Sequence, residues 1–421
     1  MPSVCFYFQV HQPFRVARFT HFDSVIWTDY FDVQKNASIC RKVAQKCYLP
    51  TNAKLLELIQ RHDGAFRVSF SITGTALEQF EAYAPEVLDS FVRLAQTGCV
   101  EFIGETYYHS LAALYSEDEF RAQVKLHTKA IQKYFGQTPR VFRNTELIYN
   151  DRIGQLAREI GFEAIIAEGV DDVLDWRSPN FVYTVHNSDA KLLLKNYKLS
   201  DDIAFRFSNR GWEEFPLTAD KFSGWVHRVS GNGDVVNLFM DYETFGEHQW
   251  ASTGIFEFLD YLPGEIMKHP DWNFATPFEV VSRYSARADL HFHRLTSWAD
   301  LERDLTAWRG NTMQEKALAE VYSLEKQVKS LNDLRLLAVW RKLLTSDHFY
   351  YMCTKWFADG DVHAYFSPFE SPYDAFVNYM NVLKDFKREL DKGSSALSKD
   401  KGSHSKKSGP RSSETTELLS A

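Results

Sequence analysis

The sequence predicts a parallel α/β fold of the barrel type. Apolar segments alternate with helical segments at intervals of roughly 30 to 60 residues, as in a parallel sheet with helical crossovers. About six or seven of the apolar segments end in polar or charged residues, which in a barrel gather at the carboxyl ends of the strands. The alternative, a doubly wound open sheet, needs a glycine-rich phosphate turn, and the sequence contains neither GxGxxG nor GxxxxGK[ST].

Seven segments are predicted to form strands, because each is apolar and is followed by turn-forming or polar residues. Pro13, for example, prevents the first strand from continuing beyond His11 and Gln12. The predicted strands are residues 3–10, 66–72, 100–104, 141–144, 162–169, 235–242 and 278–284.

Helices are predicted from apolar residues at helical spacing and from residues that cap helix ends. The clearest helix, 116–136, begins with a capping box of Ser116 and Glu119 and ends at Gly136. The other helical segments are 51–62, with Thr51 as the N-cap, 151–160, 299–309, 313–345 and 372–391.

The distribution of these elements divides the chain into three parts. Residues 1–298 hold the predicted strands and form the barrel. Residues 299–391 are helical, and we expect them to pack on the barrel and contribute to its site. Residues 392–421 are rich in Ser, Lys and Gly, and we expect a disordered tail because little apolar surface offsets the entropy of ordering.

Composition excludes several classes of protein. Among 421 residues, 48 Lys and Arg face 56 Asp and Glu, and a net charge of -8 disfavours nucleic-acid binding. The 5 Cys form no CxxC pair, which argues against a disulfide framework or a thiolate zinc site. The opening MPSVCFYFQV has no signal-peptide pattern, and no run approaches the ~18 apolar residues of a membrane span. We therefore expect a cytoplasmic protein with no membrane association.

Several carboxylates are predicted to converge at the carboxyl ends of the strands. The strand-end residues are His11, Thr73, Glu101 with Glu105, Glu146, Glu168 and Asp241. Cleavage of a glycosidic bond needs one protonated and one ionised carboxyl group on opposite sides of the bond. Arg143 would hold Glu146 ionised, and burial after the run VVNLFM would raise the pKa of Asp241. Structural ion pairs would explain either carboxylate equally well.

Other chemistries have weaker support. Three groups imitate pairs of metal ligands: Asp171 with Asp172, His291 with His293, and Glu247 with His248. None has the HxxxH spacing near a strand-end Asp that a barrel deacetylase uses, so we predict no metal and no cofactor. A serine nucleophile is not supported either, because the sequence lacks GxSxG.

Five motifs in order carry a family resemblance. They are FQVHQP at 8–13, GCVEFIGETYYHSL at 98–111, FRNTELIY at 142–149, MDYETFGEHQW at 240–250 and LLTSDHFYYM at 343–352. Together they resemble the five sequence regions of glycoside hydrolase family 57, and the third and fourth look like its α-amylase branch. The resemblance extends from residue 4 to about residue 352.

The resemblance implies an incomplete (β/α)7 barrel, similar to a TIM barrel, followed by a helical region. It also implies a retaining hydrolase of α-1,4-glucans, with Glu146 as the nucleophile and Asp241 as the acid/base. The substrate-binding residues would be His11, Glu101 and Asp347, which match family positions, and Trp250, which would stack on a sugar ring.

Three alternatives to hydrolysis stay open. They are a 4-α-glucanotransferase or other transglycosylase, a catalytically inactive glucan-binding homologue, and a metal-dependent deacetylase on a similar barrel. Some members of the α-amylase-like group lack a catalytic carboxylate, whereas this chain keeps both. The partner is therefore predicted to be an α-glucan oligosaccharide or polysaccharide, and the oligomeric state is left open.

Overall fold

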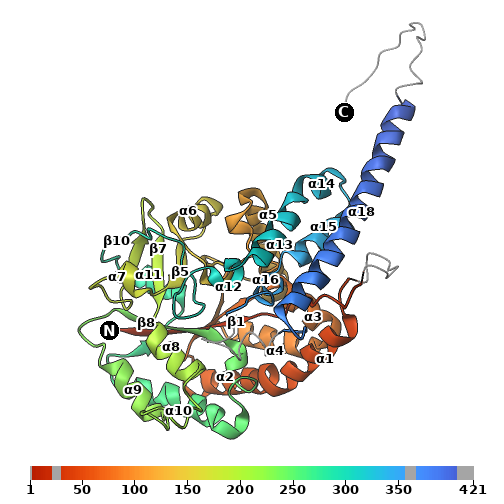
Figure 1. Cartoon of the computed structure of the whole chain (residues 1–421). Coiled ribbons are helices and arrows are strands. Elements are labelled where there is room, and N and C mark those ends of the chain that lie inside the picture. The colour runs from red at the N-terminus through yellow and green to blue at the C-terminus, as the bar shows by residue number, and fades with distance from the viewer. Residues whose placement is uncertain (1, 21–29, 356–366, 405–421) are drawn as a thin grey trace, which may run out of the picture.

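The computed structural model describes residues 2–20, 30–355 and 367–404, with side chains up to Ser395 (Figure 1). The strands in this part of the chain are β1 (Ser3–Val10), β2 (Val68–Ile72), β3 (Val100–Phe102), β4 (Val141–Arg143), β5 (Ala164–Glu168), β6 (Tyr183–Val185), β7 (Lys191–Lys195), β8 (Val235–Asp241), β9 (Asn273–Phe274) and β10 (Asp289–Leu290).

Helices connect most of the strands and make up most of the described chain after residue 300. The first group is α1 (Val33–Val43), α2 (Leu49–Arg61), α3 (Gly74–Tyr83), α4 (Pro85–Gln96), α5 (Glu117–Phe135), α6 (Asp151–Ile160), α7 (Asp171–Leu174), α8 (Tyr197–Ala204), α9 (Ala219–His227), α10 (Ile255–Met267) and α11 (Pro277–Arg283). The second group is α12 (Thr306–Arg309), α13 (Thr312–Ser323), α14 (Glu325–Ser330), α15 (Leu334–Leu343), α16 (Ser346–Tyr350) and α18 (Pro372–His404).

The strands form two sheets that meet at both ends. One sheet has the order β3-β2-β1-β8, with β9 beside β1, and the other has the order β10-β6-β7-β5-β4. Gly104 and Phe142 form a parallel bridge between β3 and β4, and the Asn196 amide donates to the Asn237 carbonyl between β7 and β8. These contacts join β1, β2, β3, β4, β5, β7 and β8 in a ring whose in-sheet pairs are parallel. The predicted parallel α/β class is confirmed.

Strand β1 lies between β2 and β8 in the first sheet and is buried on both faces. Because side chains alternate along a strand, Cys5 and Tyr7 point into one apolar cluster, with Phe239 of β8 and Val141 of β4. Phe6 and Phe8 point into another cluster, under helices α1–α4, α9 and α10. The first cluster fills the ring of strands, and the second holds the helices against its outer surface.

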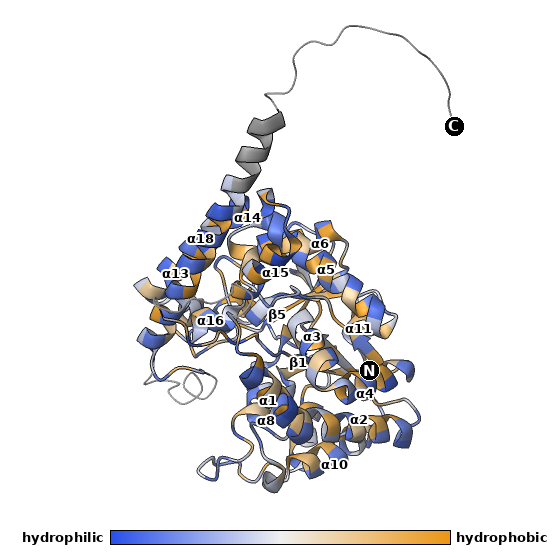
Figure 2. Cartoon of the chain, turned by 90° about the vertical axis from the view of Figure 1, so that its right-hand side faces the viewer, coloured by the Kyte–Doolittle hydropathy of each residue, from blue (hydrophilic) through white to orange (hydrophobic). Residues whose placement is uncertain are grey.

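The helices after residue 300 pack on the other side of the ring (Figure 1). Helix α18 lies along α13 and α14 and then extends past them. Its buried side chains recur at helical spacing, at Ala375, Tyr379, Val382, Leu383, Phe386 and Leu390. In Figure 2, blue and orange residues accordingly alternate along α18 and α13.

Six of the seven predicted strands are present, and the prediction for 278–284 is wrong. This segment is helix α11, because Thr276 and Glu279 form a capping box and Pro277 occupies the first turn. The antiparallel pair β6 and β7 was not predicted. Strand β7 has an apolar centre, Leu192–Leu194, between two lysines, and it pairs with β5 on its other edge.

The helices predicted before residue 298 are present, but their capping contacts and first residues differ in part from the predictions. The 116–136 helix is capped by Ser116, whose Oγ accepts from the Glu119 amide at 3.2 Å, but Glu119 forms an ion pair with Arg341 at 2.7 Å instead of closing the capping box. Helix α2 begins at Leu49, so Thr51 lies inside it and is not its cap.

Three boundaries after residue 298 also differ from the predictions. Segment 299–309 is helical only at Thr306–Arg309, and 313–345 contains three helices, α13, α14 and α15. Helix α18 continues to His404, so the predicted end of the helical region at residue 391 is wrong. Residues 405–421 of the predicted tail lie outside the described residues. Among the described helices, none combines the length and apolarity needed to cross a bilayer.

Candidate active site

The carboxyl ends of the ring strands carry most of the predicted site residues. Glu146 follows β4, Asp241 ends β8 opposite Gln9 of β1, and His11 follows β1 directly. Thr73 follows β2, and Glu168 and Lys195 end β5 and β7. Parallel strands therefore bring together residues that are far apart in the sequence, as the barrel prediction requires.

Glu146 is held in a constrained conformation by three side-chain or backbone partners. Its φ of 56° lies in the left-handed region, which is uncommon for a residue other than glycine. Its Oε1 accepts from Ser346 Oγ at 2.8 Å and lies 3.2 Å from His109 Nε2. Its Oε2 accepts from the indole nitrogen of Trp298 at 2.8 Å, and the Trp298 amide donates to the Glu146 carbonyl at 3.2 Å. The orientation of this carboxylate is therefore fixed.

His109 bridges two carboxylates. Its Nδ1 lies 3.3 Å from Glu105 Oε2 and its Nε2 lies 3.2 Å from Glu146 Oε1. Burial alone would lower the pKa of His109, but the hydrogen bonds to Glu105 and Glu146 raise it to about 9. His109 is therefore an imidazolium at neutral pH, and it donates one hydrogen bond to each carboxylate.

The charge of His109 decides the ionisation of Glu146. Burial alone would raise the pKa of Glu146, but the hydrogen bond and positive charge of His109, with a contribution from Arg143, lower it below its usual value. The prediction that Arg143 holds Glu146 ionised is therefore incomplete, because His109 has the larger effect. Arg143 is fully buried, donates to Glu105 Oε2 at 3.4 Å, and lies 5.4 Å from the Phe239 ring centroid. Both cations favour an ionised Glu146.

The pKa of Asp241 is shifted in the opposite direction from that of Glu146. Burial, reinforced by the negative charge of Glu146, raises the pKa of Asp241 to about 7 although Arg143, His109 and Lys195 lower it. Two residues later, burial and the charge of Asp241 raise the pKa of Glu243 to about 8, and Glu243 accepts a hydrogen bond from Tyr48. Near neutral pH the site thus holds an ionised Glu146 and an Asp241 that carries a proton for part of the time.

His11 lies beside this pair and is linked to the helical region. Its Nδ1 is 3.0 Å from Thr73 Oγ1, its Nε2 is 2.9 Å from Asp347 Oδ2, and its ring stacks on His109 at 4.1 Å. Burial and the charge of His109 lower the pKa of His11, so the neutral ring donates through Nε2 to Asp347. The charge of Asp347 is itself stabilised, because His11 lowers its pKa despite burial.

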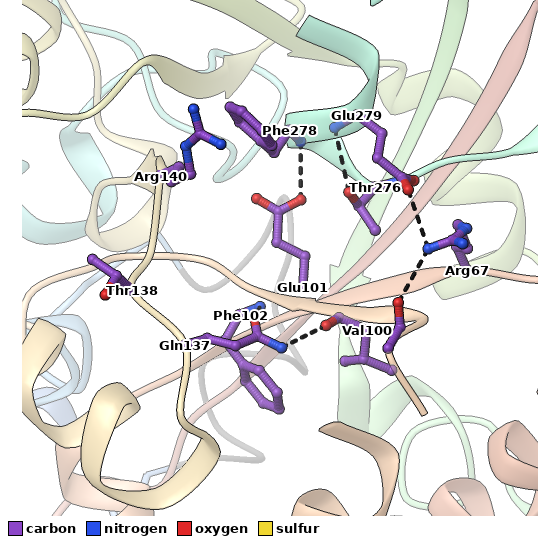
Figure 3. A pocket seen from close by; sticks show the side chains of 11 residues that line it. Arg67, Val100, Glu101, Phe102, Gln137, Thr138, Arg140, Thr276, Phe278 and Glu279 are labelled. Carbon is purple, nitrogen blue, oxygen red and sulfur yellow. Dashed lines mark hydrogen bonds and ion pairs between the residues drawn. The ribbon is translucent and has the colours of Figure 1, made fainter. Parts of the chain in front are cut away.

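The prediction that Glu101 lies near the reaction centre is wrong. Glu101 is in the middle of β3, opposite Ser69 of β2, and its Oε2 accepts from the Phe278 amide at 2.9 Å. It lies in a separate pocket, lined also by Arg67, Gln137 and Arg140 (Figure 3). The volume of this pocket is about 260 Å³. The strand-end acid of this segment is Glu105, which lies four residues later and contacts His109, Gln9 and Ser71.

Trp250 is not a core residue. Its side chain is 61% exposed, and Lys46 Nζ lies 5.8 Å from its ring centroid. The ring is therefore accessible to a ligand, and the stacking role stays a prediction.

The three pairs that imitate metal ligands do not act as pairs. His291 contacts Asp151, whereas His293 lies 3.7 Å from Asp172, so the two histidines have different carboxylate partners. Asp172 forms a bidentate ion pair with Arg294, while the Tyr197 hydroxyl donates a hydrogen bond to Asp171. Glu247 pairs with Lys42 and Lys46.

Three residues of the site were not predicted to function there: His109, Trp298 and Ser346. Glu105 was predicted at a strand end, but its contact with His109 was not. His109 lies in the segment 98–111, and its position close to Glu105 and the predicted strand end was the available signal. Trp298 and Ser346 are 152 and 200 residues from Glu146, and no sequence pattern links them to it.

Comparisons with known proteins add an independent result. The model of the family described as "Glycosyl hydrolase family 57" matches residues 5–291. A protein of Methanocaldococcus jannaschii named "Putative alpha-amylase" is 46% identical over 395 residues, which are 91% of this chain and 84% of that protein.

Two solved structures share the fold. A GH57 branching enzyme of Thermococcus kodakaraensis is 13% identical, with a TM-score of 0.69 over 92% of this chain and 90% of that one. The 4-alpha-glucanotransferase of Thermococcus litoralis is 17% identical, with a TM-score of 0.57 over 83% of this chain and 51% of that one, so this chain spans about half its length. The family match over most of the chain confirms the resemblance of the five motifs, and the protein belongs to glycosyl hydrolase family 57.

Proposed function

We propose that the protein is a retaining glycoside hydrolase that cleaves α-1,4-linked glucans. The observation that carries this proposal is the opposite ionisation of two neighbouring carboxyl groups: Glu146 is kept ionised by His109, and Asp241 has a pKa of about 7. A retaining glycosidase needs this combination, an anionic nucleophile and a protonated acid. The substrate class is supported by the amylase name of the relative from Methanocaldococcus jannaschii.

In the first step, Glu146 attacks the anomeric carbon while Asp241 gives its proton to the departing glycosidic oxygen. Positive charge that develops on the sugar ring is stabilised by the Glu146 carboxylate before the bond forms. The hydrogen bonds from Trp298, Ser346 and His109 keep the carboxylate in one orientation, so little reorganisation accompanies the attack.

The second step needs Asp241 as a base, and the charges of the site favour this change. The negative charge of Glu146 raises the pKa of Asp241. Once Glu146 is esterified to the sugar, that charge is gone and the pKa of Asp241 falls. Asp241 then accepts a proton from the water that attacks the anomeric carbon, and Glu146 leaves as a carboxylate.

The site is completed by both predicted parts of the chain. We assign residues 1–298 to an incomplete (β/α)7 catalytic barrel and residues 299–404 to a helical region that supplies Ser346 and Asp347. Ser110 and Thr345 form an antiparallel bridge, and the Ser346 amide donates to the His109 carbonyl at 2.9 Å. We place the substrate along His11 and Asp347, with Trp250 as an outer stacking platform. Glu101 has no substrate role in this scheme.

The proposal is tested by following the anomeric configuration of products from maltooligosaccharides by NMR. Retention with net gain of reducing ends is the expected result, and β-configured first products would refute the mechanism. Glu146→Gln should abolish turnover while glucan binding and the melting temperature stay near wild type. Asp241→Asn should regain activity on substrates with a good leaving group, which need no proton in the first step.

The same experiment separates the alternatives. Disproportionated oligosaccharides without a net gain of reducing ends would indicate a transglycosylase, in which a sugar hydroxyl replaces water at the second step. Glucan binding without any turnover by the wild type would indicate an inactive homologue. Either outcome would replace the hydrolytic assignment.

A further inference from the structure

A cluster of side chains that could bind a metal ion lies outside the candidate active site. Asp151, His186 and His291 each offer one ligand atom, and these atoms lie within 4.8 Å of one another. The three residues come from different segments: the first turn of α6, the connection after β6, and the residue after β10. The fold therefore assembles the cluster from residues separated by up to 140 positions in the sequence.

The Asp151 carboxylate is held in place with one oxygen directed at the cluster. Its Oδ1 accepts a hydrogen bond from the Phe292 amide at 2.9 Å. Its Oδ2 is hydrogen-bonded to Nδ1 of His291. A carboxylate oxygen and an imidazole nitrogen that approach this closely can bind one metal ion with little movement.

His186 is oriented by a carboxylate of its own. Its Nδ1 lies 2.7 Å from Asp289 Oδ1, and Asp289 Oδ2 accepts from the Asn187 amide at 3.4 Å. When Nδ1 donates to Asp289, Nε2 keeps its lone pair for a metal. A histidine that binds metal through one nitrogen and donates to a carboxylate through the other is the usual arrangement in zinc proteins. The rings of His186 and His291 are 4.7 Å apart, centroid to centroid.

We propose that Asp151, His186 and His291 form a binding site for a divalent first-row transition metal, of which Zn²⁺ is the best match. Two imidazoles and one carboxylate are ligands that suit Zn²⁺, with the fourth position open to water. Bond lengths of about 2.0–2.2 Å place tetrahedral ligand atoms about 3.3 Å apart. Ligand atoms that are now up to 4.8 Å apart would therefore approach by at most about 1.5 Å, while the hydrogen-bonded Asp151 and His291 atoms would separate to admit the ion. The carboxylates of Asp151 and Asp289 together balance the charge of the ion.

The position of the site gives the metal a structural consequence. Tyr149, two residues before Asp151, forms an antiparallel bridge with Thr296, five residues after His291, through N–H···O bonds of 3.0 and 2.9 Å. The same two segments continue to Glu146 and Trp298. A bound ion would cross-link the outer ends of these segments, so we expect it to stabilise the folded chain without contacting the reaction centre.

The test is calorimetric titration of metal-free full-length protein with Zn²⁺ alone, together with the absorption spectrum of the Co²⁺ form. Wild type should bind one equivalent that is lost in His186→Ala and in His291→Ala. Asp289→Asn keeps all three ligands and should weaken binding about 10–100-fold. The matched control is His293→Ala, which removes an exposed histidine two residues from His291 and should bind as wild type does.

The melting temperature provides a second readout. Saturating Zn²⁺ should raise it by about 2–4 °C in wild type and His293→Ala but not in His186→Ala. Circular dichroism verifies that each variant folds. If an alanine variant does not fold, the weaker Zn²⁺ binding expected of Asp289→Asn still tests the proposal. The proposal is overturned if wild type binds no Zn²⁺ at micromolar concentration, or if His186→Ala, His291→Ala and Asp289→Asn all bind it with wild-type affinity.

Discussion

Replacing His109 by Asn should move the pH–activity profile of the protein to higher pH. His109 donates to Glu146 and keeps it ionised, and its positive charge also lowers the pKa of Asp241. Asn is the suitable replacement because the φ of His109 is 50°, a left-handed conformation that Asn tolerates better than most residues. The variant therefore removes the charge while it preserves the backbone.

The size of the shift follows from the interaction that is lost. A hydrogen bond to a charged group contributes about 1.5–3 kcal/mol, and one pKa unit corresponds to about 1.4 kcal/mol. The pKa of Glu146 should therefore rise by about 1–2 units. The active form needs Glu146 ionised and Asp241 protonated, so the acidic limb of the profile moves up by about this amount. The alkaline limb also moves up, because Asp241 loses a cation that lowers its pKa.

The assay is kcat/KM for maltooligosaccharide cleavage across pH 4–10. On the acidic limb, His109→Asn should lose about 10–100-fold relative to wild type, and the ratio should recover towards alkaline pH. His293→Asn is the matched control, because that side chain is 54% exposed and contacts Asp172. An acidic limb that stays in place, or moves to lower pH, would refute the assignment of His109 as the group that ionises Glu146.

Three further predictions concern other residues. Trp298→Phe removes the 2.8 Å hydrogen bond to Glu146 Oε2 and should lower kcat/KM about 10–100-fold, whereas Trp250→Phe, at an exposed ring, should lower it little. Trp250→Ala should raise KM for long maltooligosaccharides at constant kcat and change the free energy of unfolding by less than ~0.5 kcal/mol; an unchanged KM would exclude a stacking role. Burial raises the pKa of Glu101 to about 7, so the unfolded chain ionises first, and this group lowers the stability by up to about 3 kcal/mol as pH rises from 4.5 to 7. Glu101→Gln should remove that part of the pH dependence in denaturant titrations and leave kcat/KM unchanged; a large loss of kcat/KM would restore Glu101 to the site.

The sequence alone determined the parallel α/β class and the positions of Glu146 and Asp241. Both conclusions depend on local patterns: an apolar strand must be buried on both faces, and the polar residue that ends it emerges at the same edge as its neighbours. Six strand positions and the Ser116 cap were predictable for this reason. Segment 278–284 was not, because its apolar run resembles a strand while Thr276, Pro277 and Glu279 begin a helix.

The choice between Glu101 and Glu105 depended on the tertiary structure. Strand β3 is only Val100–Phe102. On one edge, the Val100 carbonyl and the Phe102 amide form hydrogen bonds with the Gln137 side chain instead of with another strand. Glu101 pairs with Ser69 near the start of β2 and faces the pocket of Figure 3, whereas Glu105 follows the end of β3 and lies beside His109. Alternation along a strand cannot distinguish two acids four residues apart, because both point to the same face.

The ionisation of the site was decided entirely by groups distant in the chain. His109, Trp298 and Ser346 contact Glu146 from 37, 152 and 200 residues away, and Asp347 reaches His11 across 336. A pKa depends on desolvation and on charges within a few ångströms, and both are properties of the folded chain. The sequence thus specified which carboxylates stand at the strand ends, and burial together with the tertiary contacts of His109 and Arg143 decided which of them is ionised.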